Sequence, residues 1–167
     1  MATASDLPAD RLAIGQLLVR LLYLFRQELL TAAAERGYHD IRAPHLQIFG
    51  NIGVDGIRLT DLAARAQLSL AATSEFVTEL QQLGYLERRP DPADGRAKLI
   101  FPTPRGRKAL DDAGDQVAEI EQQWSALVGR SRFDHAGRTL QDLLDQLGQA
   151  ADSRQSAAEA RELRPKT

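Results

Sequence analysis

The chain has 167 residues, of which 43% are hydrophobic and 26% are charged, a balance typical of a folded globular protein. It contains no cysteine, which excludes disulfides, thiolate catalysis and cysteine-ligated zinc. The three histidines, His39, His45 and His135, lack the spacing of metal ligands, and the formal net charge is −2. We therefore expect no metal and no cofactor, and any site for a polyanion must concentrate its positive charge locally.

No segment has the pattern of an export signal or a membrane span. The first ten residues carry Asp6 and Asp10 without a basic cluster, unlike a secretory signal. The most apolar run, residues 17–25, contains Arg20 and is far shorter than the roughly 20 residues that cross a bilayer. We therefore expect a cytoplasmic protein.

The first third of the chain predicts two helices after a flexible polar lead over residues 1–8. Residues 9–36 are rich in leucine and lack proline, which predicts one long helix. Its apolar residues cover more than one face, so the helix requires two packing partners, its own domain and a second subunit. Gly37 ends it, and Pro44 suits the first turn of a second helix over residues 43–52.

The middle of the chain has the pattern of a winged helix. Residues 59–66 predict a short helix, and Ser69 is a good N-cap for a further helix over 70–83, so the two form a helix-turn-helix. Strands are expected at 85–89 and 98–102, with Asp94-Gly95 at the tip of the hairpin between them.

Two more helices are expected, over residues 104–128 and 134–150, followed by a disordered polar tail over residues 151–167. Charge divides unevenly along this half. Residues 84–108 contain seven basic and three acidic residues, a net charge of +4. Residues 109–150 contain three basic and eight acidic residues, a net charge of −5. The hairpin and the start of the next helix are therefore the expected basic face.

The order of these elements resembles the MarR family of winged helix-turn-helix transcriptional regulators. The hairpin sequence Asp91-Pro92-Ala93-Asp94-Gly95-Arg96 fits the family's D-P-x-D-x-R wing pattern. The exit Pro102-Thr103-Pro104-Arg105-Gly106 keeps the threonine and glycine of L-T-x-x-G, with Pro102 in place of leucine.

The resemblance implies a mostly α (α+β) fold in a single domain over residues 9–150. A DNA-binding lobe over 43–103 would carry the wing at 85–103, and residues 9–36 and 104–150 would form an intertwined dimerisation region. The expected function is that of a homodimeric repressor that binds a palindromic operator in double-stranded DNA. A small aromatic or anionic ligand would relieve the repression.

The wing is the strongest candidate for DNA contact. Arg96 is expected to enter the minor groove, with Asp94 fixing its guanidinium by a bidentate pair. The alternative is that Asp94 only forms the turn and Arg96 is an exposed charge. Arg88, Arg89 and Lys98 are expected to contact phosphates, although on a strand only one of Arg88 and Arg89 can face the duplex, and the other pairs with a carboxylate.

The helix over 70–83 contains no lysine or arginine, which is unusual for a helix that enters the major groove. Its two acids, Glu75 and Glu79, would repel phosphates unless they point away or accept a hydrogen bond from cytosine. DNA contacts must then come from short side chains: Ser69, Ala71, Ala72, Thr73, Ser74 and Thr78.

The sequence specifies a ligand pocket less clearly. Candidate lining residues, near the junction of the first, second and fifth helices, are Tyr23, Arg26, His39, Arg42, His45 and Phe49. For the two histidines, a solvated or core position at a helix boundary is favoured over a ligand contact. A winged-helix protein-interaction module without DNA binding is the alternative function, favoured by the acidic groove helix. We expect no enzyme, because no nucleophile–base set or phosphate-binding loop is present.

Overall fold

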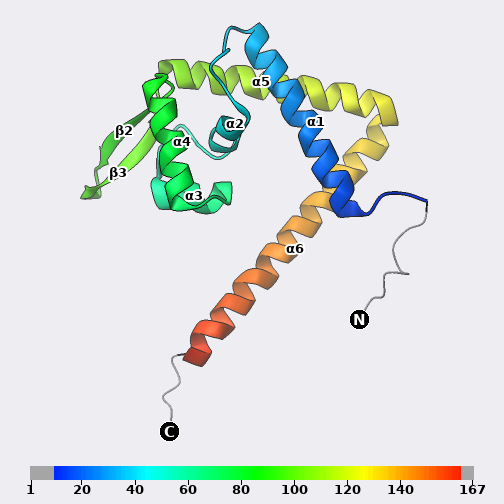
Figure 1. Ribbon diagram of the computed structural model, residues 1–167. Helices are drawn as coiled ribbons and strands as arrows, with labels where there is room; N and C mark the ends of the chain where they lie inside the picture. Colours follow the sequence, from blue (N-terminus) through cyan, green and yellow to red (C-terminus); the bar gives the residue numbers. More distant parts are fainter. Residues whose placement is uncertain (1–9, 163–167) are drawn as a thin grey trace. The chain divides into compact units, whose positions relative to one another are not determined.

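The computed structural model describes residues 10–162, apart from the side chains of Arg96 and of residues 151–162. It is mostly helical with a small antiparallel sheet (Figure 1), as the fold-class prediction states. The predicted lead over residues 1–8 lies outside the described part. The elements run in the order α1 Ile14–Glu35, α2 Ala43–Phe49, β1 Ile57–Arg58, α3 Leu59–Ala66, α4 Leu70–Gln82, β2 Leu86–Asp91, β3 Asp94–Pro102, α5 Pro104–Val128 and α6 Arg130–Glu162.

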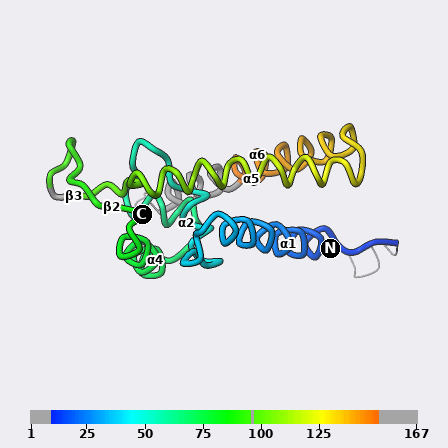
Figure 2. The backbone as a smooth tube through the Cα atoms, turned by 90° about the horizontal axis from the view of Figure 1, so that it is seen from above, coloured from blue at the N-terminus to red at the C-terminus, as the bar shows by residue number. Residues whose placement is uncertain are grey.

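The sheet has three strands in the order β1-β3-β2, all antiparallel. Leu86 of β2 pairs with Pro102 of β3, and Ile57 of β1 pairs with Ile100. Strand β1 was not predicted from the sequence, because two residues are too few to show an alternating pattern. Figure 2 shows the β2–β3 hairpin projecting from one end of the lobe.

The tip of the hairpin differs from the prediction. Asp91 pairs with Asp94, so the loop consists of Pro92 and Ala93 and not of Asp94-Gly95. Proline suits the first loop position of a turn because its φ is already fixed near −65°. Gly95 lies on β3 without a positive φ, so the turn does not use its conformational freedom.

One hydrophobic core holds α2, α3, α4 and the sheet together. Ile48, Leu62, Val77 and Leu80 from the three helices are each 0% exposed, and Ile100 of β3 is 1% exposed. Side chains from the three helices and the sheet therefore pack together and bury their apolar surface, which fixes α4 against the hairpin.

The chain divides into two compact units within α5, one ending at Ile120 and the other beginning at Glu121. The second unit consists of the end of α5 and the whole of α6. Helix α6 reaches Glu162, beyond the helix end predicted near residue 150, because residues 151–162 are rich in alanine, glutamate and arginine, which favour helix. Within the described residues, no helix is both long and apolar enough to cross a membrane.

Candidate nucleic-acid interface

The turn between α3 and α4 sets where α4 begins. Gln67 ends α3 in the left-handed region with φ of 52°. Ser69 is the N-cap of α4, and its Oγ accepts a hydrogen bond from the backbone N of Ala72 at 3.2 Å. This arrangement satisfies one of the free N–H groups at the helix start and leaves the first turn of α4 at the surface.

The side chains predicted to contact DNA from α4 are not equally available. Ser69, Ala71 and Thr78 are exposed, and Ala72 and Ser74 are half-buried. Thr73 is 0% exposed, and its Oγ1 donates to the backbone O of Ser69 at 2.9 Å. Thr73 therefore belongs to the core and does not reach a groove, which corrects its place among the predicted contacts.

Glu79 of α4 is held against α2. The Nε2 atom of His45 lies 2.9 Å from its carboxylate, and Arg42 forms an ion pair with the same oxygen. The backbone N of Arg42 donates to Nδ1 of His45 at 3.2 Å, so Nε2 carries the proton and donates to Glu79. Hydrogen bonds from His45 and then Arg42 hold the pKa of Glu79 below its usual value. The negative charge of Glu79 is thus paired with Arg42 within the protein, whereas Glu75 is exposed.

The two arginines of β2 diverge, as alternation along a strand requires. The guanidinium of Arg88 lies 3.5 Å from Thr78 Oγ1, so this side chain lies beside α4. Arg89 instead forms an ion pair with Glu87 at 2.5 Å, and its Cζ lies 4.9 Å from the centre of the Phe101 ring. Lys98, on the opposing strand, is exposed.

An ion pair that was not predicted from the sequence fixes the base of the wing. Nε and Nη2 of Arg58 donate to one carboxylate oxygen of Asp91 at 3.0 and 2.5 Å, and the backbone N of Ala93 donates to the other at 2.8 Å. The bond from Ala93 and then those from Arg58 hold the pKa of Asp91 below its usual value. Asp91 is 7% exposed, so this clamp joins β1 to the hairpin loop. The Asp94–Arg96 pair stays a prediction, because the Arg96 side chain lies outside the description.

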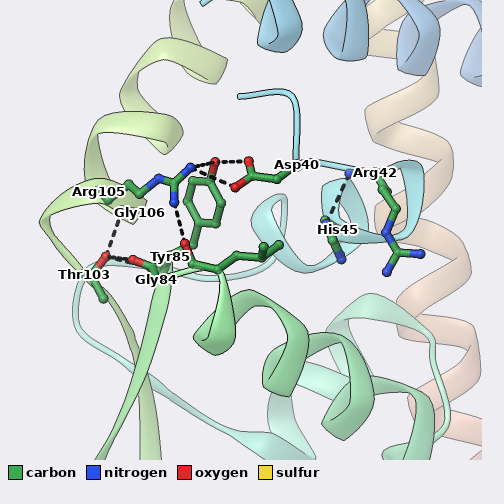
Figure 3. Close-up of polar contacts among 9 residues, drawn as sticks. Asp40, Arg42, His45, Gly84, Tyr85, Thr103, Arg105 and Gly106 are labelled. Atoms are coloured by element: carbon green, nitrogen blue, oxygen red, sulfur yellow. Dashed lines mark hydrogen bonds and ion pairs between the residues drawn. The ribbon is translucent and has the colours of Figure 1, made fainter. Parts of the chain in front are cut away.

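A second polar cluster joins the lobe to α5 (Figure 3). The guanidinium of Arg105 donates to Asp40 at 2.9 Å and to the backbone O of Leu83 at 2.6 Å, and its Cζ lies 4.1 Å from the centre of the Tyr85 ring. The hydroxyl of Tyr85 donates to Asp40 at 2.6 Å. Burial raises the pKa of Asp40, but the bonds from Tyr85 and Arg105 outweigh it and hold that pKa below its usual value.

A pocket lies beside this cluster, among α1, α2 and the first part of α5. Of the six predicted lining residues, Phe49 lines it. The others are placed elsewhere: His45 is buried against Glu79, and Tyr23, His39 and Arg42 are exposed, while Arg26 is half-buried. The lining is mainly apolar and consists of Leu29, Ala32, Ala33, Arg36, Tyr38, Ile41, Leu46, Phe49, Ala109, Asp112, Ala113 and Gln116.

The polar groups of the pocket are already satisfied by one another. Asp112 accepts from the Tyr38 hydroxyl at 2.5 Å and from Lys108 Nζ at 2.7 Å, and Arg36 donates to Gln116 at 2.7 Å. Hydrogen bonds from Lys108 and then Tyr38 hold the pKa of Asp112 below its usual value. The pocket therefore offers an apolar surface with paired charges at its edge.

Comparison with known proteins gives a family match and many similar folds. Residues 39–97, which run from before α2 into β3, match the sequence model of the MarR family. A search of curated proteins finds no match.

Three solved structures illustrate the similarity of fold. CouR from Rhodococcus jostii RHA1, bound to p-coumaroyl-CoA, is 25% identical with a TM-score of 0.64, covering 86% of this chain and 95% of its own. A MarR family transcriptional regulator from Rhodococcus sp. RHA1 is 25% identical with a TM-score of 0.63, covering 78% and 91%. The S. aureus MepR–DNA complex is 18% identical with a TM-score of 0.65, covering 82% and 99%.

Proposed function

Residues 39–97 of this chain match the sequence model of the MarR family, and on that basis we propose that the protein is a DNA-binding regulator of transcription. The observation that carries the proposal is the fixed arrangement of α4 beside the wing. Arg88 lies against Thr78 of α4, and the Arg58–Asp91 pair anchors the hairpin. A helix with an exposed first turn and a neighbouring cationic hairpin suits the major groove and the adjacent backbone. MepR, of the same fold, forms a complex with DNA.

In this function Arg88 and Lys98 contact phosphates, and Arg96 inserts into the minor groove. Arg89 has a smaller role, because its charge is partly neutralised by Glu87. Ser69, Ala71, Ala72, Ser74 and Thr78 remain the proposed contacts of α4, without Thr73.

We further propose a homodimer on a palindromic operator. Within α1, Leu18, Leu22 and Tyr23 are 43%, 47% and 62% exposed, and Leu143 and Leu144 of α6 are 48% and 66% exposed. Apolar surface on this scale is costly in water and is removed when a second subunit covers it.

A repressor that a small ligand releases is the finer proposal. The pocket among α1, α2 and α5 is the proposed site, and CouR of the same fold is bound to p-coumaroyl-CoA. Because Arg36 and Asp112 already have partners, the pocket favours the apolar part of a ligand over a free anionic group.

The second candidate function is a protein-interaction module. The observation that favours it is the absence of lysine and arginine from α4, together with the exposed Glu75.

A DNA-binding titration distinguishes the two functions. Fluorescence anisotropy with double-stranded DNA from the gene's own upstream region is measured at 50 and 200 mM salt for wild type, Arg96→Ala and Arg88→Ala. We expect tight binding that weakens steeply with salt, and each variant to lower the salt slope by about 1. Arg138→Ala, an exposed arginine on α6, is the matched control. If the wild-type protein binds no duplex at low salt, the DNA-binding function is wrong and the protein-interaction module becomes the favoured function.

A further inference from the structure

Leu70 is exposed at a position where the fold does not require an apolar side chain. Within the lobe from α2 to β3, as far as side chains are described, the exposed large hydrophobic residues are Val54 and Leu70. Leu68, two residues earlier, packs against the core, whereas Leu70 is 50% exposed on the first turn of α4. At that first position its side chain leans toward the N-terminal end of the helix, which faces the base edges in a helix-turn-helix.

The polar side chains of α4 are largely committed to the protein itself. Ser69 Oγ caps Ala72, and the hydroxyls of Thr73 and Thr78 donate to the backbone O atoms of Ser69 and Ser74. Glu79 is bound by His45 and Arg42. With no lysine or arginine in the helix, α4 cannot make the charged bidentate contact that reads guanine.

The major groove presents one apolar group to a side chain of this kind, the C5-methyl of thymine. Leu70 and the exposed Ala71 form an adjoining apolar surface at the helix start. We propose that Leu70 is a specificity-determining residue that contacts a thymine methyl, so that α4 selects a T·A pair by an apolar contact. This inference rests on the proposed DNA-binding function and deepens it by naming the base that α4 reads.

Removing the methyl group from the DNA tests the contact directly. The wild-type protein first selects its preferred sites from a pool of random double-stranded oligonucleotides. Each thymine of the selected site is then replaced in turn by deoxyuridine, which lacks only the methyl. We expect one such position in each half-site to weaken binding about fourfold, the value of one buried methyl-sized group.

The matching protein variant is Leu70→Ala. It should bind the thymine site about as weakly as wild type binds a site that carries uracil at that position in both half-sites, because a dimer loses two contacts, and it should bind both DNAs equally. Val54→Ala, which removes the other exposed apolar side chain of the lobe, is the control and should keep the full dependence on the methyl. Thermal melts monitored by circular dichroism establish that both variants fold.

Three results are decisive against the inference. A wild type that binds its selected site but tolerates every uracil overturns it while leaving the proposed function intact. A Leu70→Ala variant that keeps the wild-type preference for thymine over uracil has the same effect. If no duplex is enriched in the selection, both the function and the inference fail.

Discussion

Gly106 allows α5 to begin directly against the start of β2. A Cβ built at this position would lie 2.0 Å from the backbone O of Tyr85. The same oxygen accepts the backbone N–H of Thr103 at 2.9 Å, and Thr103 Oγ1 donates to the backbone O of Gly84 at 2.7 Å. The threonine and glycine of the exit motif thus have a steric and hydrogen-bonding reason to stand three residues apart.

Replacing Gly106 by alanine should destabilise the lobe by about 1–3 kcal/mol, because the methyl collides with backbone that cannot yield without moving β2. Urea denaturation at fixed protein concentration measures the loss. Gly114→Ala, on the same helix with open space around its Cβ, is the control. It should stabilise by roughly 0.5–1 kcal/mol, since alanine favours helix. Equal stability of the two variants would contradict the assigned role of Gly106.

Glu79→Gln should lower the melting temperature at pH 7, because it removes the charge that Arg42 pairs with. The folded state holds the pKa of Glu79 below its ordinary value of 4.5, through His45 first and Arg42 second. Its contribution is therefore fully present above pH 4.5 and is lost as the pH falls through the folded-state pKa.

Melting curves of wild type and Glu79→Gln between pH 7 and pH 3 check this prediction. The difference between them should shrink as the pH falls below 4.5. Glu75→Gln, one turn earlier on the exposed side of α4, should change the melting temperature little at pH 7. A difference that grows toward acid pH would show that Glu79 is not bound as its carboxylate.

At the scale of elements, the wing depends on a clamp between β1 and the hairpin loop. Asp91→Asn removes the charge that both Arg58 nitrogens contact. We expect faster hydrogen exchange in β2 and β3 and severalfold weaker DNA binding, because a looser hairpin must be ordered on binding. Asp55→Asn, in the exposed loop before β1, is the control. Unchanged hydrogen exchange in the hairpin would show that the Arg58–Asp91 pair does not make the wing rigid.

The helices of the lobe could be predicted because their boundaries carry local signals. Pro44 and Pro104 stand at first helical turns, and Ser69 caps α4 as expected. Elements that depend on distant partners were missed. β1 exists through its pairing with β3, and the Arg58–Asp91 clamp joins residues 33 apart in sequence.

The candidate site shows the same division between local and distant effects. The divergence of Arg88 and Arg89 follows from strand alternation and could be predicted. The burial of Thr73 and the binding of Glu79 by His45 depend on how α4 meets α2, which no local pattern specifies. The pocket lining differs from the predicted lining for the same reason, since it comes from three helices and from the loop between α1 and α2.

At the scale of the whole molecule, α6 exposes an apolar stripe. Leu140, Leu143, Leu144 and Leu147 are 37%, 48%, 66% and 55% exposed and follow the i, i+3, i+4, i+7 spacing of a single helix face. In a dimer with twofold symmetry, both subunits contribute the same leucine face to the interface, so one substitution changes the interface at two places.

Leu144→Glu therefore tests the proposed dimer sharply. Two charges placed in a shared apolar interface should cost about 3 kcal/mol, or roughly a hundredfold in the Kd of the dimer. Sedimentation velocity across a concentration series measures that constant. Gln149→Glu adds the same charge to the opposite face of the helix and should leave the dimer intact, because a rotation of about 100° per residue places position 149 at least about 120° from each of the four leucines. A wild type that sediments as a monomer throughout would remove the homodimer, and with it the need for a palindromic operator.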